Sequence, residues 1–301
     1  MSDIKILEGG VTAAKGFKAA YTEAGVKYAN RKDMAMVFSE TPCVSAGTFT
    51  SNVVKAACVQ WDMKLVKSDK PMHGMVINTG IANACTGKEG FDACEATAKA
   101  MSENLGVPTD SIAVGSTGVI GMQLPVEKLV KGVNDMCGKL DDSKENGTNA
   151  SIAIMTTDTV NKEYAVSFEL GGKTVTLGGM SKGSGMIHPN MCTMIALLTS
   201  DIAIEKTLMR LNSKAPSQSR KNWKSYSKIA SRSLKNEQRH CGSIPGSVIC
   251  LTKKEKTRNI LVFIKHCNLT FQAHIRSCKT MSKTIRRGIH LPISSHLPGR
   301  I

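Results

Sequence analysis

The sequence has few aromatic residues and lacks the cysteine spacings of disulfide-rich or zinc-binding domains. Aromatic residues make up 4% of the 301 residues, so a packed core must be built from Val, Ile, Leu, Met and Ala. The ten cysteines include no CxxC pair, and their spacings fit no disulfide framework and no zinc module. We therefore expect reduced thiols, a cytoplasmic protein and no bound metal.

The sequence also lacks signals for export and for membrane insertion. The opening residues MSDIK lack the basic-then-apolar order of a signal peptide. The longest apolar run, residues 191–204, contains Asp201 and is too short to cross a bilayer. We expect no association with a membrane.

Acidic residues are scarce in the last third of the chain. Residues 211–301 hold 19 Lys or Arg, two acids and no Asp, a net charge of +17, whereas the preceding residues hold 21 basic and 22 acidic side chains. The formal charge of +16 would suggest a polyanionic partner, but the excess is confined to this one segment. We therefore divide the chain near residue 208 into an α/β region and a basic tail, 209–301, that is predicted to be irregular or disordered.

The α/β region shows both helical and strand periodicity. Residues 178–190, rich in glycine, are predicted as a loop. A tail strand at 260–264 has no convincing neighbours. The other predicted elements are strands at 73–78 and 112–114, helices at 89–105 and from Pro125 to about 140, a hairpin of 164–170 and 173–177, and a strand at 193–199 buried on both faces.

Thr193 follows the glycine-rich stretch and begins the apolar run. If its hydroxyl attacks the carbonyl of Cys192, the bond between them breaks and Thr193 becomes an N-terminal residue. The freed α-amine, with an ordinary pKa of ~8, can then serve as the base for the hydroxyl of the same residue. The alternative is a Thr that simply begins a strand.

Three other groups could carry chemistry. Gly115-Ser116-Thr117-Gly118 is predicted as a turn in which a hydroxyl and a backbone N–H hold an oxyanion, or as an ordinary turn between strand and helix. Residues 153–159, which include Thr156 and Thr157, could contact a substrate or form a capped turn. Lys182 could bind a substrate carboxylate or be a solvated lysine. Residues 80–87 match neither GxGxxG nor a P-loop, so no nucleotide cofactor is expected.

Taken in order, these motifs resemble the bifunctional glutamate N-acetyltransferase/ornithine acetyltransferase family of arginine biosynthesis. The resemblance runs from about residue 5 to 208, and its last motif is long and specific. The matching stretches are GGVTAAKGFKAA (9–20), GTFTSN and VKAA (47–57), NTGIANACTG (78–87), GSTGVIG (115–121), IMTTDT (154–159) and GGMSKGSGMIHPNMCTM (178–194).

The resemblance implies a fold, a cleavage and a reaction. The fold is a layered α/β sandwich, with sheets packed together and helices outside. Members cleave themselves before a nucleophilic Thr, so residues 1–192 would form an α chain and 193–208 would begin a β chain, assembled as α2β2. Thr193 would take the acetyl group of N-acetylornithine and pass it to glutamate through an acyl-enzyme. Bifunctional members also accept acetyl-CoA, and no resident cofactor is implied.

Five positions of this chain match functional residues of the family. Thr117 and Gly118 match the oxyanion-hole pair. Lys182, Thr193 and one Thr of the TTD motif, Thr156 or Thr157, match substrate-binding positions.

Two motif positions depart from the family pattern. Cys192 stands before the cut in place of the usual Ala, and it is still small. Ile81 replaces the usual Asn in the stretch GIANA.

The tail departs from the family pattern altogether. A family β chain should supply an acidic substrate-binding residue and, near its end, an Asn and a Ser or Thr, and none of these can be placed in 209–301. Our hypothesis is that the gene or its reading frame was disrupted near 208–212. Resequencing that finds this tail in an intact frame, with no β-chain-like sequence in another frame, would refute it.

Two other function classes deserve comparison with the acetyltransferase. One is a self-processing Thr-nucleophile aminopeptidase or amidase, against which the TTD and SKGSGM motifs argue. The other is an inactive remnant whose basic tail binds nucleic acid nonspecifically. The tail has few aromatic residues for stacking on bases, so specific recognition of nucleic acid is not expected.

Overall fold

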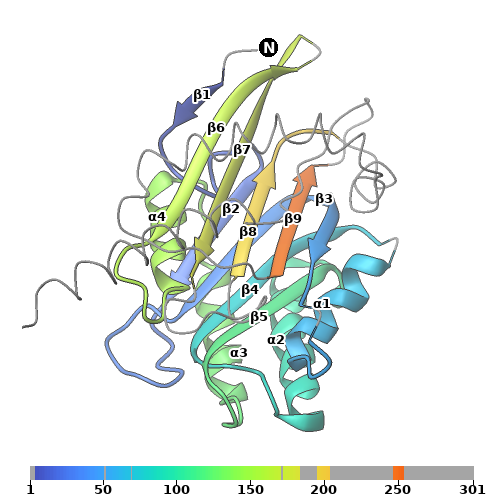
Figure 1. The fold of residues 1–301 in the computed structure, drawn as a ribbon, viewed down its shortest axis with the longest axis vertical. Coiled ribbons are helices and arrows are strands. Elements are labelled where there is room, and N and C mark those ends of the chain that lie inside the picture. Colours follow the sequence, from blue (N-terminus) through green and yellow to red (C-terminus); the bar gives the residue numbers. More distant parts are fainter. Residues whose placement is uncertain are drawn as a thin grey trace, which may run out of the picture.

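The computed structural model describes residues 4–50, 52–68, 70–170, 172–183, 195–203 and 247–253. In chain order its elements are β1 Lys5–Leu7, β2 Phe17–Thr22, β3 Met34–Thr48, α1 Ala57–Lys67, β4 Met72–Ile81, α2 Gly87–Leu105, η1 Thr109–Ser111, β5 Ile112–Val119, α3 Val126–Cys137, α4 Lys144–Ala153, β6 Lys162–Leu170, β7 Lys173–Lys182, β8 Ile195–Ser200 and β9 Ser247–Lys253 (Figure 1). Within these residues one hydrogen-bonded sheet runs in the order β1-β6-β7-β8-β9-β3-β4-β5, and β2 also pairs with β3.

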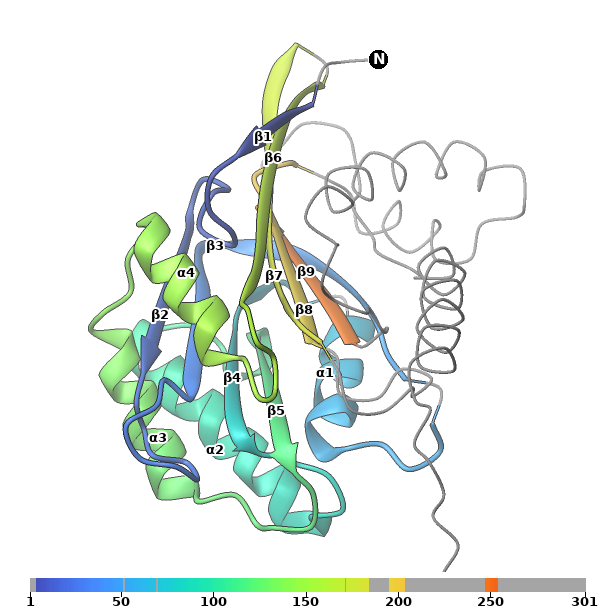
Figure 2. The same cartoon turned by 60° about the vertical axis from the view of Figure 1, so that its left-hand side comes forward.

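Strand β3 is long enough to take part in two layers of this sheet. Its residues 34–38 lie between β2 and β4, and its residues 43–48 pair with β9. The register shifts between Phe38 and Cys43, a stretch that contains Pro42, which has no N–H to donate to a neighbouring strand. The sheet therefore folds into a layer of β2 to β5 and a layer of β6 to β9 (Figure 2).

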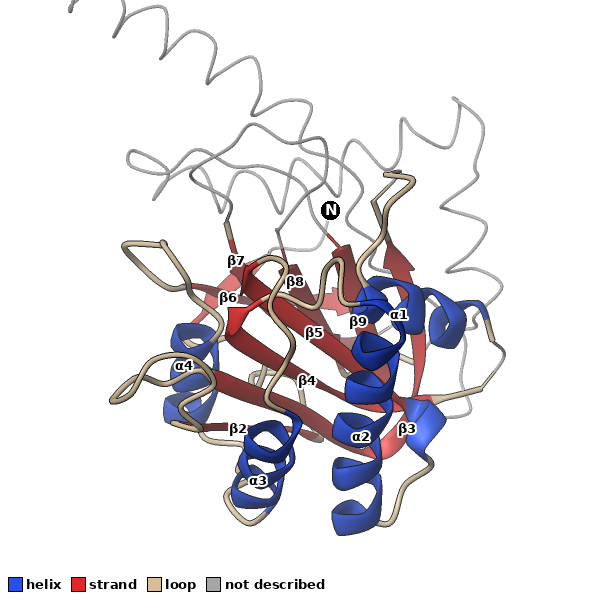
Figure 3. Cartoon of the chain, turned by 90° about the horizontal axis from the view of Figure 1, so that it is seen from below, coloured by secondary structure: helices blue, strands red, loops and turns tan. Residues whose placement is uncertain are grey.

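Alternation along the strands divides the apolar residues into two cores. On one side of β4, Met75 packs in a cluster with Met180 of β7 and Leu197 of β8, so this core lies between the two layers. On the other side of β4, Val76 packs in a cluster with Met101 of α2. Figure 3 shows α1, α2 and α3 on this outer face. The arrangement is the layered α/β sandwich that the sequence predicts.

Several predicted elements are confirmed, and the structure extends some of them. The strand at 73–78 is the middle of β4, the helix at 89–105 is α2, and the hairpin is formed by β6 and β7. The buried strand predicted at 193–199 overlaps β8 over residues 195–199. Helix α2 ends at Gly106, whose φ of 66° is left-handed and whose N–H donates to the carbonyl of Ser102. These elements were predictable from apolar runs, from strand alternation, and from helical periodicity with a glycine at the helix end.

Two stretches predicted as turn or loop are strand, and those predictions are wrong. Residues 115–118 belong to β5, because they pair in parallel with residues 77–80 of β4. Residues 178–182 belong to β7 and pair with β6 and β8. Glycine here permits close approach of backbones: a Cβ on Gly178 would lie 2.1 Å from the carbonyl oxygen of Gly10. The rest of the predicted loop, 184–190, lies outside the described residues.

Strand β9 lies in the segment that was expected to be irregular. It pairs in parallel with β8 and antiparallel with residues 43–48 of β3. Its sequence SVICLTK contains four successive apolar residues, which is the pattern of a short buried strand. The tail strand predicted at 260–264 lies outside the described residues.

Close packing between β3, β4 and α2 can be tested with a pair of Gly→Ala substitutions. A Cβ on Gly74 would lie 2.5 Å from the carbonyl oxygen of Val37 and 2.6 Å from Cε of Met101. We expect Gly74→Ala to lower the free energy of unfolding by about 1–3 kcal/mol, measured by urea denaturation.

Gly138 supplies the matched control for this measurement. It has a helical φ of −75° and open space around its would-be Cβ. Gly138→Ala should leave the free energy of unfolding unchanged or raise it by about 0.4–1 kcal/mol. Equal urea midpoints for the two variants would contradict the packing described for Gly74.

Candidate active site

The ends of β5 and β7 turn two polar side chains into the space between the layers. Residues two apart on a strand share a face. Ala113 and Met180 belong to the core between the layers, so Thr117 on β5 and Lys182 on β7 face the same space. The Nζ of Lys182 donates a hydrogen bond of 3.1 Å to Oγ1 of Thr117. The exposed fractions are 2% for Lys182 and 1% for Thr117, so this contact is shielded from water.

Burial and two neighbouring charges set the electrostatics of Lys182. Burial lowers the pKa of this lysine, because a charged ammonium is less stable away from water. The carboxylate of Asp158 opposes this effect, and the ammonium of Lys162 adds to it. A buried cation whose pKa is perturbed by burial and by a nearby acid is typical of functional sites.

Thr117 and Gly118, the predicted oxyanion pair, follow each other at the end of β5. Because the Thr117 hydroxyl accepts a bond from Lys182, its own hydrogen is left to donate to another group. Gly118 has φ of 142°, and a Cβ there would lie 2.2 Å from the carbonyl carbon of Gly80. Only glycine fits this backbone position. Ser116, beside them, donates to Oδ1 of Asn78 at 2.7 Å and so ties β5 to β4.

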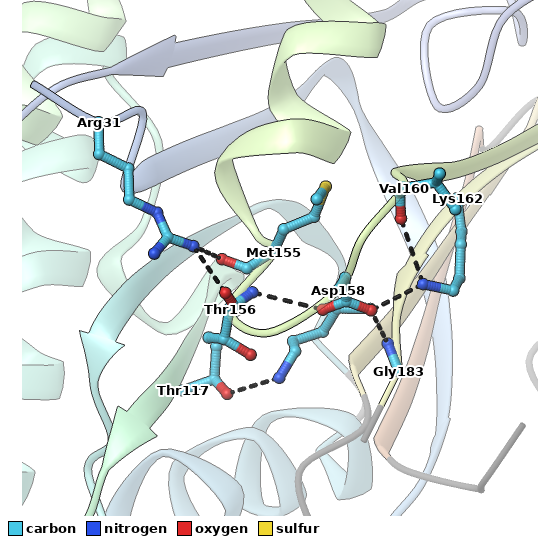
Figure 4. Close-up of polar contacts among 9 residues, drawn as sticks. Arg31, Thr117, Met155, Thr156, Asp158, Val160, Lys162 and Gly183 are labelled. Atoms are coloured by element: carbon cyan, nitrogen blue, oxygen red, sulfur yellow. Dashed lines mark hydrogen bonds and ion pairs between the residues drawn. The ribbon is translucent and has the colours of Figure 1, made fainter. Parts of the chain in front are cut away.

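The TTD loop, residues 156–158, is held by Arg31 on one side and, through its own Asp158, by the backbone after Lys182 on the other (Figure 4). Nη2 of Arg31 donates to the carbonyl oxygens of Met155 at 2.5 Å and Thr156 at 3.2 Å. On the other side, Oδ2 of Asp158 accepts from the N–H of Thr156 at 3.3 Å, and Oδ1 accepts from Gly183 at 2.9 Å. The loop is therefore fixed to the residue that follows Lys182.

The carboxyl of Asp158 is ionised in spite of its burial. Burial raises its pKa, but the bonds from Lys162, Gly183 and Thr156 outweigh that effect and hold the pKa below the ordinary value. Lys162 contributes the nearest charge, with Nζ 2.7 Å from Oδ1.

The structure brings together most of the residues that the motifs single out. Thr117, Gly118, Lys182 and the TTD loop meet at the same end of the space between the layers. Thr156 is partly buried and bonded through its backbone, whereas Thr157 is exposed.

The two residues of the predicted cleavage site, Cys192 and Thr193, lie outside the described residues. Arg31 was not anticipated, because an arginine between β2 and β3 carries no motif and its partners are backbone carbonyls 124 and 125 residues away.

Two further features of the described ranges concern membrane-spanning helices and a hollow in the structure. No helix among the described residues is long and apolar enough to cross a membrane. A hollow of about 490 Å³, lined among others by Lys55, Cys85 and Phe91, contains none of the residues predicted for the site.

Sequence comparison identifies relatives of the chain. The sequence model of the ArgJ family matches residues 18–223, somewhat beyond the limit of 208 inferred from the motifs. The arginine biosynthesis bifunctional protein ArgJ of Gloeobacter violaceus is 43% identical over 211 residues, which are 70% of this chain and 51% of that protein. The chain spans about half the length of the curated relatives it matches.

Structure comparison finds the same relatives. The chain resembles the arginine biosynthesis bifunctional protein ArgJ of Bacillus halodurans with a TM-score of 0.60 and 40% identity, over 64% of this chain and 99% of that one. It resembles the ornithine acetyltransferase of Mycobacterium tuberculosis, solved with ornithine, with a TM-score of 0.57 and 39% identity, over 62% of this chain and 98% of that one. Because the family match spans well over half of its residues and the fold agrees, the chain belongs to the ArgJ family.

Proposed function

We propose that this chain carries the acetyl-transfer site of an enzyme of arginine biosynthesis, with Thr193 as the nucleophile. The acetyl group would pass from N-acetylornithine to glutamate, and acetyl-CoA would be a second donor. The observation that carries the proposal is the buried contact of Lys182 with Thr117, next to the glycine-only position 118. A soluble, cytoplasmic α2β2 enzyme is the setting that the family resemblance implies.

Covalent geometry supports this role for Thr193. Ile195 is the register partner of Lys182 across β7 and β8. Thr193 stands two residues before Ile195, and two residues of chain span at most about 7 Å. This short connection to the register partner of Lys182 supports Thr193 as the nucleophile of the proposed site.

The proposed reaction begins with attack on the acetyl donor. Oγ of Thr193 attacks the acetyl carbonyl of N-acetylornithine, and its proton passes to the α-amine freed by cleavage. The hydroxyl of Thr117 and the N–H of Gly118 hold the negative oxygen that forms. The C–N bond to ornithine then breaks, and the α-ammonium returns the proton to the departing amine. Attack by the amine of glutamate on the acetyl ester reverses these steps and releases N-acetylglutamate.

The charge on Lys182 suits the substrates of this reaction. Both N-acetylornithine and glutamate carry an α-carboxylate, and a buried ammonium binds a carboxylate strongly because little water competes. The solved relative that holds ornithine supports an amino-acid substrate.

The lengths of the relatives support self-cleavage. The solved chains are covered almost completely, 98–99%, by 62–64% of this chain, which is about 190 of its 301 residues. The curated relatives are covered only to 45–51% by about 210 residues. Solved chains of roughly half the curated length are consistent with a break near the Cys192–Thr193 bond.

Some residues that the resemblance calls for come from the second half of the family's length, beyond the family match of this chain. The resemblance calls for an acidic residue, an Asn and a Ser or Thr from the second half of the family's length, and the family match ends at residue 223. Disruption of the gene or its reading frame near residues 208–212 stays our hypothesis for the tail. It leads us to expect that cleavage and transfer by this chain are slow.

Self-cleavage is tested by denaturing electrophoresis and intact mass measurement of the purified chain. We expect partial conversion to fragments of residues 1–192 and 193–301. Thr193→Ala should give one uncut band, because the attacking hydroxyl is removed, and Thr174→Ala, at an exposed position, should cleave like the unsubstituted chain. A single uncut band from the unsubstituted chain, unaltered by Thr193→Ala, would overturn the proposal.

The oxyanion assignment is tested by acetyl transfer from N-acetylornithine to glutamate. Gly118→Ala should lower the transfer rate by about 100- to 1,000-fold, because the displaced N–H no longer meets the oxyanion. Gly121→Ala is the control, since Gly121 also has a positive φ, 84°, but has open space around its would-be Cβ. A normal rate for Gly118→Ala would exclude this role. Release of amino acids from peptide amides in place of transfer would favour an amidase.

A further inference from the structure

Asp158, the last residue of the TTD loop, accepts three hydrogen bonds through one buried carboxylate. Its side chain is 4% exposed. Oδ1 accepts from Nζ of Lys162 at 2.7 Å and from the N–H of Gly183 at 2.9 Å, and Oδ2 accepts from the N–H of Thr156 at 3.3 Å. Two of these donors are backbone groups, so the carboxylate fixes main chain on both sides of itself.

The main chain that Asp158 fixes leads directly to two predicted site residues. Gly183 is joined by a peptide bond to Lys182, whose side chain reaches Thr117. Thr156 lies in the TTD loop, which Arg31 holds from the opposite side. A Cβ on Gly183 would lie 3.4 Å from Oδ1 of Asp158, so the carboxylate rests directly against this backbone.

We propose that Asp158 is a positioning residue of the acetyl-transfer site, which clamps the TTD loop to the end of β7 and keeps the Lys182 ammonium aimed at Thr117, with a negative charge nearby. The inference rests on the proposed function, because it assigns Asp158 its role through Lys182. Asp158 itself need not touch the substrate.

Electrostatics give the clamp a second effect. Among the described residues, the charged groups that act on Lys182 are Asp158, which raises its pKa, and Lys162, which lowers it. Burial lowers the pKa of Lys182 further, and the carboxylate of Asp158 opposes that shift and so favours the charged ammonium. A neutral Lys182 would lose its charge-assisted bond to a substrate carboxylate.

The opposite signs of the two neighbours provide a test that does not need activity. Asp158→Asn keeps the side-chain shape and removes the negative charge, so the pKa of Lys182 should fall. Lys162→Gln removes the positive charge, so the pKa of Lys182 should rise. A general loosening of the structure would move the pKa in the same direction in both variants.

The titration is measured by NMR on the full chain labelled with ¹³C at the lysine Cε. The resonance of Lys182 is identified by its absence from Lys182→Met. Opposite shifts in the two variants support the inference, and an unchanged pKa of Lys182 in Asp158→Asn overturns it.

Kinetics then connect the clamp to transfer. Asp158→Asn should lower kcat/KM for transfer by about 100-fold, largely through a higher KM, because small misplacements of a binding group are costly. The alkaline limb of its pH profile should move to lower pH, since Lys182 loses its proton earlier. Asp158→Glu should restore the position of that limb but only part of kcat/KM, because the longer side chain restores the charge and not the geometry.

The matched control is another acid in an i,i+4 pair with lysine. Asp92 bonds Lys88 at 2.7 and 2.9 Å on the surface of α2, as Asp158 bonds Lys162. Asp92→Asn should leave kcat, KM and the pH profile unchanged. If the unsubstituted chain transfers acetyl groups and Asp158→Asn equals it, the inference fails and the proposed function stands. If the unsubstituted chain neither cleaves nor transfers, the proposed function fails with the transfer role of Asp158, and the titration still decides whether Asp158 sets the charge of Lys182.

Discussion

Backbone pairing along β3 holds the two layers together, since one half of this strand lies between β2 and β4 and the other half pairs with β9. The change of register near Pro42 lets a single strand serve both layers. The layers consequently face each other across a shared apolar core, and the ends of β5 and β7 meet at its margin. The contact between Lys182 of β7 and Thr117 of β5 crosses between the two layers that β3 joins.

A buried ammonium is costly, and the structure around Lys182 shows how the cost is met. The lysine has a hydroxyl acceptor in Thr117 and an ionised acid, Asp158, near enough to oppose the effect of burial. Asp158 is in turn held by one ammonium and two backbone N–H groups, so its charge is stabilised as well. An apolar side chain at position 182 would fill the space without these partners, so the lysine is better explained by chemistry than by stability.

The sequence predicted the elements that are governed by periodicity. β4, α2, the β6–β7 hairpin and β8 follow from apolar spacing and from glycines at ends and turns. It failed where glycine lies inside strands, at 115–118 and 178–182, because the same residue marks a turn or a close approach of two backbones. Only tertiary contacts separate these two uses.

The candidate site residues were predicted from family motifs more than from residue spacing. Thr117, Gly118 and Lys182 were identified because their motifs resemble a family, and spacing alone left an ordinary turn and a solvated lysine as alternatives. The alternation along β5 and β7 that makes these residues face each other needs the strand assignments that the sequence missed. Arg31 and the clamp by Asp158 depend on contacts between segments far apart in the chain, which no local pattern records.

Strand β9 lies beyond residue 223, where the family match ends, yet it fills the place between β3 and β8. The ladder on both sides of it is made of main-chain N–H and C=O groups, which every residue except proline provides in full. This place in the sheet therefore makes modest demands on the sequence that occupies it. By pairing with both neighbours, β9 also covers two edges that would otherwise be open to strands of other molecules, the usual starting point of aggregation.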